Sequence, residues 1–365
     1  MVIPQVGQLL MVGFAPHEMD EVRTLAAQGR LGGVILFQRN ATKAVEVYDI
    51  TRRIVSDARG GASLLVAVDQ EHGRVCRIRE GVTLFPGPSQ LGLLNRPATT
   101  ARVAKWVAKE LLLLGINLNL APVADLPEAH WCPPVLEGRS FSTDPLVCAR
   151  HVAAWVRGSQ EGGVASCAKH FPGHGSVVGD THKGIQEDVS QRQRILGHHL
   201  IPFRAAVKAG APCVMISHVV YPALDSSAPA SLSRPVVEGL LRRVLGFRGV
   251  ALTDDLDMGA VASRMDTLDA ILEALGAGVD VALVGRNLRQ GRSISHLVEE
   301  LEKAVRGRHI SPERVRESME RVRVFKSRWI SPNHHGLSRS GSKAAAGFAR
   351  RLMREVAHWG ASSRE

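Results

Sequence analysis

Eight short apolar runs, separated by stretches with helical periodicity, most limit what this chain can fold into. The runs are QLLMVGF (8–14), GGVILF (32–37), SLLVAVDQE (63–71), GINLNLAPVAD (115–125), GVASCAKHF (163–171), PCVMISHVV (212–220), GVALTDDL (249–256) and GVDVALVG (278–285). Their apolar character is continuous rather than alternating, as expected for strands that are buried on both faces. Strands that alternate with helices about eight times predict an α/β fold, a (β/α)8 barrel of the TIM type.

The segments between and after these runs indicate the domain organisation. Stretch 101–115 is amphipathic, and stretch 266–278 ends in glycines suited to a helix stop. Because neither an internal repeat nor a second core is evident, residues 1–330 are expected to form one barrel domain. Residues 331–365 begin with SPNHHGLSRSGSK, which is rich in Ser and Gly. They are expected to form a flexible basic tail with a terminal helix.

The positive charge of the chain is concentrated near its end. The net charge is +11, and residues 286–365 carry 18 Lys and Arg against 8 Asp and Glu. Their densest part, SPERVRESMERVRVFKSR, alternates signs like a solvated helix face, with Ser311 as the expected N-cap. We therefore do not expect nucleic acid as a partner. A non-catalytic nucleic-acid binder stays open as an alternative, and it predicts binding with a steep salt dependence.

Cysteine usage and hydropathy restrict the compartment. The five cysteines are widely spaced and lack a CxxC pair, which predicts five reduced thiols. All apolar runs are far shorter than the roughly 18 residues of a membrane span. The first residues, MVIPQVGQLLMVGF, show neither a basic start nor a small-residue cleavage site. A cytoplasmic location without a membrane partner is expected.

Polar residues recur where the predicted strands end. They are Asp69, Asp125, Lys169 with His170, His218 and Asp254. The carboxyl ends of the strands in a parallel barrel share one rim, where active sites of this architecture lie. For any one of these residues, a satisfied polar group at a strand end explains the pattern equally well. Five strands that follow the same rule favour a shared pocket.

The motifs around these residues resemble the family 3 glycoside hydrolases. They are DQEHGRV (69–75), LNLAPVAD (118–125), GRSFSTDP (138–145), KHFPGHG (169–175) followed by DTH (180–182), and LTDDLDMGA (252–260). The chain is most similar to the single-domain bacterial β-N-acetylhexosaminidases of peptidoglycan recycling, from about residue 7 to about residue 325. The resemblance implies a monomeric, exo-acting, retaining β-N-acetylglucosaminidase without a metal or cofactor. Its substrate would be a GlcNAc-containing muropeptide, a small-molecule carbohydrate.

The resemblance also implies roles for individual residues. Asp254 matches the nucleophile of the covalent glycosyl-enzyme mechanism. Its neighbour Asp255 is the rival, but strand alternation is expected to let only one of the two face the pocket. His182 matches the proton donor and acceptor, oriented by Asp180. The residues that match the binding of sugar hydroxyls are Asp69, Arg139, Lys169 and His170.

Three departures from the family pattern concern the site. His72 stands where DQEGGR has its second glycine, so a bulky side chain occupies a tight turn. Ser176 and Val177 stand where the family pattern commonly has Asp-Thr. Gln186 stands at a position where family members often have a proline. These changes cluster around the expected proton-transfer loop, so they bear on its closure and on the substrate range.

Three further alternatives concern the chemistry. A histidine acid does not repel an anionic nucleophile as a carboxylate would, so phosphorolysis is an alternative to hydrolysis. A β-glucosidase of the same family would differ only in its requirement for the 2-acetamido group. A barrel metallohydrolase would gather zinc ligands from His170, His174, Asp180, His182 and His218.

Overall fold

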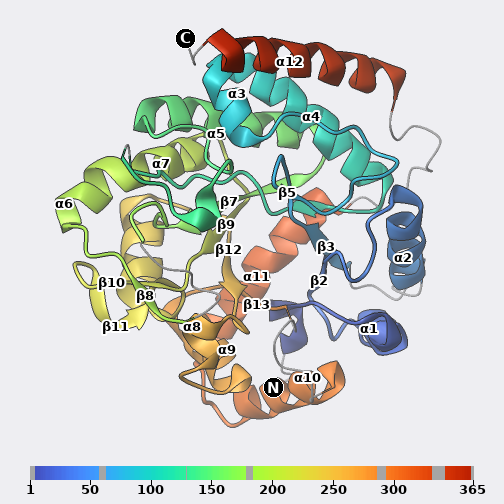
Figure 1. The fold of residues 1–365 in the computed structure, drawn as a ribbon. Coiled ribbons are helices and arrows are strands. Elements are labelled where there is room, and N and C mark those ends of the chain that lie inside the picture. The colour runs from blue at the N-terminus through green and yellow to red at the C-terminus, as the bar shows by residue number, and fades with distance from the viewer. Residues whose placement is uncertain are drawn as a thin grey trace.

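Eight parallel strands close into a barrel in the computed structural model, which describes residues 5–56, 63–128, 130–177, 184–285, 293–330 and 342–362 (Figure 1). The barrel strands are β1 (Leu10–Val12), β2 (Gly33–Leu36), β3 (Leu65–Val68), β6 (Leu118–Asn119), β7 (Ala165–Phe171), β9 (Cys213–Ile216), β12 (Val250–Asp255) and β13 (Val281–Val284). The ring closes where β1 pairs with β13, Leu10 opposite Ala282. Each predicted apolar run contains one of these strands, so the predicted (β/α)8 fold is confirmed.

Helices surround the barrel, as Figure 1 shows along its axis. They are α1 (Met19–Ala27), α2 (Ala44–Ser56), α4 (Pro97–Leu113), α5 (Pro145–Gly162), α7 (Leu200–Lys208), a π-helix (Pro235–Val244), α9 (Thr267–Ala277), α10 (Ile294–Arg306) and α11 (Pro312–Trp329). Their ends follow the local sequence. Ser311 Oγ accepts the N–H of Arg314 and caps α11, and α9 ends at Gly278 with φ +113°, as predicted.

Shorter elements lie in the connections between the barrel strands and the surrounding helices. They are the hairpin of β4 (Gln70–His72) and β5 (Val75–Cys76), a small sheet of β8 (Gln186–Glu187), β10 (Val219–Tyr221) and β11 (Asp225–Pro229), and the helices α3 (Pro88–Leu94), α6 (Arg192–Arg194) and α8 (Gly259–Ala262). Within the described ranges, 3-10 helices cover Val6–Leu9, Pro16–Glu18, Pro134–Leu136 and Ala230–Leu232, and a π-helical turn covers Ile195–His199. The β4–β5 hairpin directly follows barrel strand β3 and becomes important for the site below.

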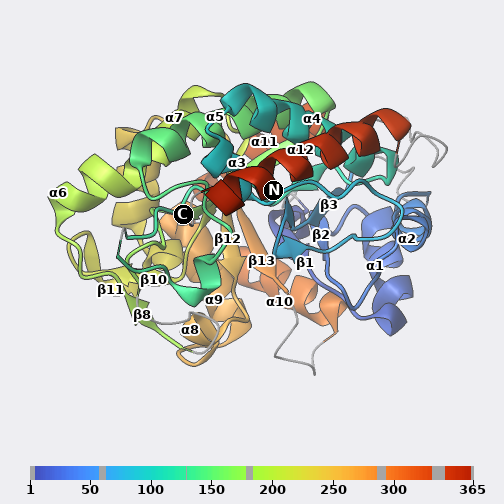
Figure 2. The ribbon, with the colours of Figure 1, turned by 45° about the horizontal axis from the view of Figure 1, so that its top comes forward.

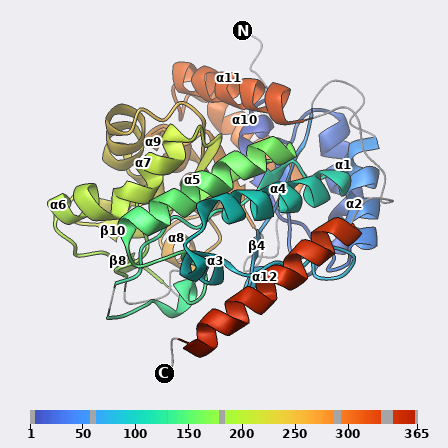
Figure 3. The ribbon, with the colours of Figure 1, turned by 90° about the horizontal axis from the view of Figure 1, so that it is seen from above.

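The last described helix, α12 (Lys343–Ser362), packs against α3, and the contact of its Phe348 with Arg102 connects it with α4 (Figures 2 and 3). Its inward side chains, among them Phe348 and Leu352, belong to the same hydrophobic core as the barrel. An ion pair of 2.8 Å between Arg96 and Glu355 adds a polar contact. The predicted connection at 331–341 lies outside the described residues.

Two expectations from composition can be compared with this structure. All five cysteines are free, and all but Cys132 are buried, which confirms the predicted reduced thiols. Within the described ranges, no helix combines the length and apolarity that crossing a membrane requires.

Candidate active site

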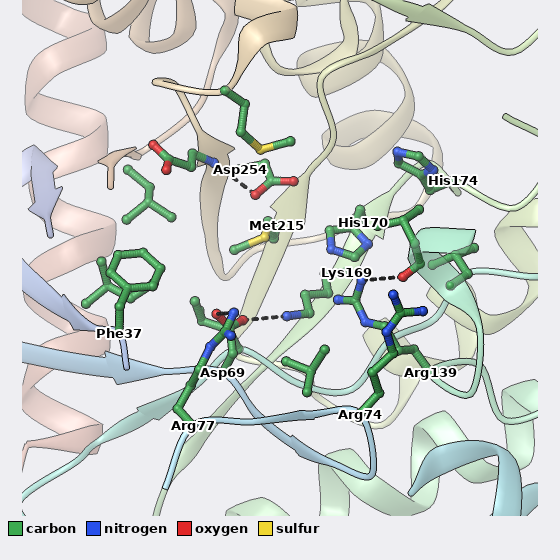
Figure 4. Close-up of a pocket in the computed structure, with 18 of the residues that line it drawn as sticks. Phe37, Asp69, Arg74, Arg77, Arg139, Lys169, His170, His174, Met215 and Asp254 are labelled. Atoms are coloured by element: carbon green, nitrogen blue, oxygen red, sulfur yellow. Dashed lines mark hydrogen bonds and ion pairs between the residues drawn. The ribbon is translucent and has the colours of Figure 1, made fainter. Parts of the chain in front are cut away.

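A cavity of about 680 Å³ opens at the carboxyl ends of the barrel strands, a size suited to a small organic ligand (Figure 4). Residues in or directly after several barrel strands line it. Asp69 directly follows β3, Lys169 and His170 lie near the end of β7, Met215 belongs to β9, and Asp254 belongs to β12. The structure therefore brings together polar residues that lie up to 185 positions apart in the sequence.

Four charged side chains form one connected group at the floor of the cavity, which we call the ion-pair cluster: Asp69, Glu71, Arg139 and Lys169. The guanidinium of Arg139 donates two hydrogen bonds to the Glu71 carboxylate, of 2.9 and 2.8 Å. Lys169 Nζ lies 2.7 Å from Glu71 Oε1 and 2.7 Å from Asp69 Oδ1. Because Glu71 is buried, it supports both cations from behind and leaves Asp69, Lys169 and Arg139 to line the cavity.

The members of this cluster stabilise each other's charge. Burial alone would raise the pKa of Glu71, but the Arg139 and Lys169 cations hold that pKa well below its usual range. Burial likewise opposes the charge of Lys169, yet the Asp69 and Glu71 carboxylates raise its pKa. At neutral pH the cavity therefore presents a fixed ammonium, a fixed guanidinium and an acceptor carboxylate, a set that suits a ligand with several hydroxyls.

Asp125, which follows β6, orients the histidine-containing turn after β7. Its Oδ2 lies 2.7 Å from Nδ1 of His170, and its Oδ1 accepts the backbone N–H groups of His170 and His174, at 3.1 and 2.8 Å. Burial opposes the charge of Asp125, but His170 lowers its pKa. The contact with Asp125 leaves Nε2 as the ring nitrogen of His170 that can meet a ligand.

The two adjacent carboxylates of β12 both line the cavity, contrary to the expectation that only one can face it. The pairing of β12 with β13 shifts register between Leu252 and Asp255, so strict alternation fails there. The two side chains nevertheless differ in their contacts. Asp255 Oδ1 accepts the backbone N–H groups of Asp257 and Gly285, at 3.0 and 2.6 Å. Asp254 is directed across the cavity from Lys169 (Figure 4).

Asp180 and His182 lie outside the described residues, so their geometry stays a prediction. Ser176, one of the departures from the family pattern, comes shortly before them. Its hydroxyl donates to Glu128 Oε1 at 2.6 Å and lies 3.2 Å from Nε2 of His199. Arg194 pairs with the second oxygen of Glu128. Polar contacts therefore fasten the chain where it enters this segment.

The structure also shows how His72, which replaces a glycine of the family pattern, is accommodated. Its backbone has φ +67°, the left-handed region that glycine adopts most readily. Its imidazole is buried, contacts the Phe85 ring edge-on with centroids 5.6 Å apart, and accepts the Phe85 N–H at Nδ1 over 3.3 Å. Burial and the nearby Arg79 charge lower the pKa of His72 to about 4, so the ring is neutral at pH 7. The larger side chain is accommodated by inward packing.

The structure adds to the site three residues that were not predicted from the sequence, Glu71, Arg77 and Phe37. Glu71 stands two positions after Asp69, a spacing that can place two side chains on one side of an extended segment. That spacing was the available signal. Arg77 Nη2 lies 3.4 Å from Asp69 Oδ2, and Phe37 lines the cavity wall. Neither residue has a local pattern that distinguishes it from an ordinary surface arginine or strand-end aromatic residue.

Two of the histidines named for a zinc site, His170 and His218, already make hydrogen bonds through their rings. His218 Nδ1 lies 2.7 Å from Ser231 Oγ, and its Nε2 lies 2.9 Å from the Asp255 carbonyl oxygen. Among the described residues, no group of three or more His, Cys, Asp or Glu side chains could hold a metal ion. This arrangement gives no support to the metallohydrolase alternative.

A parallel barrel whose carboxyl rim carries a carboxylate opposite a fixed set of hydrogen-bonding charges defines a barrel enzyme for a polar organic ligand. Comparison with known proteins makes this class specific. Residues 1–324 match the model described as the glycosyl hydrolase family 3 N terminal domain. The chain belongs to glycosyl hydrolase family 3, which confirms the resemblance and the expected class of enzyme, a glycoside hydrolase.

Relatives over most of the chain agree with this assignment. The chain is 34% identical over 364 residues to a β-hexosaminidase A of Pseudoalteromonas piscicida, covering 94% of this chain and 60% of that protein. It is 36% identical over 310 residues to a β-hexosaminidase of Stenotrophomonas maltophilia, covering 83% of this chain and 88% of that protein. A solved family 3 β-N-acetylglucosaminidase from Paenibacillus superposes with a TM-score of 0.89 at 32% identity, covering 98% of this chain and 69% of that one.

Proposed function

We propose that this chain is an exo-acting, retaining β-N-acetylglucosaminidase that hydrolyses terminal GlcNAc from its substrates. The observation that carries the proposal is the Asp254 carboxylate, which lies across one cavity from the ion-pair cluster (Figure 4). The cluster would hold the hydroxyls of one sugar ring and present its anomeric carbon to Asp254. The names of the relatives, β-hexosaminidase and β-N-acetylglucosaminidase, support the choice of sugar.

In the first half of the reaction, the Asp254 carboxylate would attack the anomeric carbon and form a glycosyl ester. His182 would protonate the leaving oxygen, with Asp180 holding its tautomer. In the second half, water would attack the anomeric carbon while His182 accepts its proton. The glycosyl ester bond would break, which frees the Asp254 carboxylate and releases the sugar with retained configuration. Asp255 is less suited to the nucleophile role because its Oδ1 accepts two backbone N–H groups, from Asp257 and Gly285, whereas Asp254 Oδ1 accepts one, from Asp255.

The proposed substrate class is a peptidoglycan-derived muropeptide, and the proposed location is the cytoplasm. Arg74 and Arg77 belong to the cavity lining beside the sugar-binding cluster. Guanidinium groups there can pair with carboxylates on the part of the substrate that leaves, as muropeptides carry. A neutral disaccharide would gain less from these two arginines.

Substrate comparison tests the proposal. We expect cleavage of nitrophenyl β-N-acetylglucosaminide and much slower cleavage of the matching β-glucoside. Added phosphate should leave both the rate and the product unchanged, whereas a phosphorylase would need phosphate and yield a sugar phosphate. Proton NMR should show the β-anomer of GlcNAc as the first product. Release of the α-anomer first would refute the retaining mechanism.

Two aspartate variants and one histidine variant separate the roles. Asp254→Asn should abolish turnover without a loss of thermal stability, because its carboxylate faces the cavity. Asp255→Asn should instead lower thermal stability, since Asp255 fixes the backbone of β12 and β13, and it should retain measurable turnover.

His182→Ala should slow turnover by roughly 10²- to 10⁴-fold, the range for a lost general acid. Ordinary activity of Asp254→Asn would show that the nucleophile is a different residue.

A further inference from the structure

The C-terminal helix α12 reaches the support of the sugar pocket through three aromatic side chains. The ring centroids of Phe348, on α12, and Phe85 are 6.3 Å apart. The ring of Phe85 contacts the imidazole of His72 edge-on at 5.6 Å. His72 ends β4, and Glu71 of the ion-pair cluster precedes it directly. We call Phe348, Phe85 and His72 the aromatic chain, because together they connect α12 with the hairpin that carries Glu71.

His72 makes the conformation of this hairpin depend on the aromatic chain. At φ +67° a residue with a Cβ atom is less favourable than glycine, so other contacts must hold the backbone there. The backbone pairing of His72 with Val75 contributes, and so do two contacts of the side chain, the hydrogen bond from the Phe85 N–H and the packing of the two rings. A glycine at this position would not need the two side-chain contacts. The histidine therefore ties the β4–β5 turn to the position of Phe85.

Phe85 is in turn held from the side of α12. The Phe348 ring is covered by Arg102 of α4, whose Cζ lies 4.1 Å from the ring centroid. The ion pair between Arg96 and Glu355 joins α12 to the start of α4. The family domain match ends at residue 324, and α12 begins at Lys343. The helix thus lies beyond the matched family domain and still contacts the layer of side chains behind the pocket.

We propose that α12 is a positioning element of the sugar pocket, acting through Phe348, Phe85 and His72 on the Glu71 carboxylate. Glu71 aligns Arg139 and Lys169 by three contacts of 2.7 to 2.9 Å, so a displaced β4 backbone would misalign both cations. Asp254 belongs to β12, on the other side of the cavity. Loss of the aromatic chain should therefore weaken substrate binding more than the chemical step. This inference rests on the proposed function for the identity of the ligand.

Phe348→Ala in the full-length chain tests the proposal. For nitrophenyl β-N-acetylglucosaminide we expect KM to rise about 3- to 10-fold while kcat changes less than about twofold, the pattern of lost binding interactions. Phe348→Leu should restore most of the wild-type KM because it refills the space beside Phe85. Hydrogen exchange of the backbone amides in residues 69–78 should become faster in Phe348→Ala, with or without substrate.

Two further variants separate positioning from general stability. Leu352→Ala removes a buried side chain from the same face of α12 but leaves the aromatic chain intact. It should lower Tm by a similar amount and leave KM and the exchange of residues 69–78 unchanged. In a His72→Gly background the connection is already broken, so adding Phe348→Ala should not raise KM further.

The possible outcomes are distinct. If Phe348→Ala lowers Tm but leaves both KM and hairpin exchange at wild-type values, α12 only stabilises the fold and the proposal is wrong. The same conclusion follows if Phe348→Ala has equal effects with His72 and with Gly at position 72. If the wild-type chain cleaves no β-N-acetylglucosaminide, the proposed function fails, while hairpin exchange still decides whether α12 positions the hairpin.

Discussion

At the scale of single residues, Glu71 shows how one buried carboxylate sets the charge of a binding pocket. It does not line the cavity, yet it is the shared partner of Arg139 and Lys169, which do. Two cations this close together would repel each other without a carboxylate between them. Glu71 thus permits two positive donors to point at one ligand.

Replacing Glu71 by Gln keeps the shape of the side chain and removes its charge. We expect KM to rise at least about tenfold and the free energy of unfolding to fall by about 3–5 kcal/mol, because buried cations lose their counterion. The pKa of Glu71 is held below its unfolded value of 4.5, so its stabilising contribution is present above pH 4.5 and is lost as pH falls through the lowered pKa. The stability difference between wild type and variant should therefore shrink in acid.

Substrate titration at pH 7, and urea unfolding at pH 7 and at pH 3, measure these effects. Glu137→Gln is the matched control, since Glu137 pairs with Arg74 at 3.5 Å while its side chain is 80% exposed. An exposed pair contributes about 0–1 kcal/mol, so this control should behave like wild type. An unchanged KM for Glu71→Gln would mean that the ion-pair cluster does not hold the sugar.

At the scale of elements, the barrel strands could be located from sequence because parallel strands buried on both faces leave continuous apolar runs. The lengths of the strands could not be predicted in the same way. The run at 115–125 contains only the two residues of β6. Backbone hydrogen bonds to the neighbouring strands continue after β6, but their pattern is irregular and side chains supply some of the bonds. Asn119 Oδ1, for example, accepts the Gln70 N–H at 3.0 Å. Such side-chain bonds to the backbone have no periodic signature.

The candidate site was predictable to a similar degree. Polar residues at strand ends identified the rim, but the partners of those residues lie far away in the chain. Arg139 and Glu71 are 68 residues apart, and Phe348 follows Phe85 by 263 residues. Long-range pairs leave no local pattern in one sequence. The register shift that turns both Asp254 and Asp255 toward the cavity is equally invisible, since it depends on pairing with β13.

The elements at the opposite end of the barrel meet at one buried carboxylate, Asp280, just before β13. It pairs with Arg242 of the π-helix and with Arg314 and Arg321 of α11. Asp280→Asn should lower the free energy of unfolding by about 3–5 kcal/mol, because three guanidinium groups lose their shared partner. KM should not change, since Asp280 lies at the amino end of its strand and the cavity lies at the carboxyl ends.

Chemical denaturation and steady-state kinetics of the same preparations test this separation. Glu317→Gln is a suitable control, because Glu317 also pairs with Arg314 but its side chain is 58% exposed. Its effect on stability should stay below about 1 kcal/mol. A rise in KM for Asp280→Asn would show that the two ends of the barrel are coupled, contrary to this expectation.

At the scale of the whole molecule, the two ends of the barrel sequence close on each other. The 3-10 helix Val6–Leu9 packs against α10 and α11, and β1 pairs with β13. Lys326 of α11 donates to the side-chain oxygen of Gln8 in this contact, which links the last barrel helix to the first described element. Lys326 is buried there, and burial lowers its pKa to about 7. The closure therefore contains an amine that is easier to bury when it is neutral.

Replacing Lys326 by Met should stabilise the protein by about 1–3 kcal/mol at pH 7, after allowance for the donor that Gln8 loses. Because the folded pKa of Lys326 lies below the unfolded value of 10.5, the unfolded chain binds the extra proton between pH 7 and 10.5. Burying the lysine thus lowers the free energy of unfolding most below pH 7, and this destabilisation disappears as pH rises toward 10.5. The gain in Lys326→Met should shrink accordingly when urea unfolding is repeated from pH 6 to pH 10. Lys303→Met, at an exposed position of α10, should give no such trend, and a pH-independent difference for Lys326→Met would show that the buried amine stays protonated throughout.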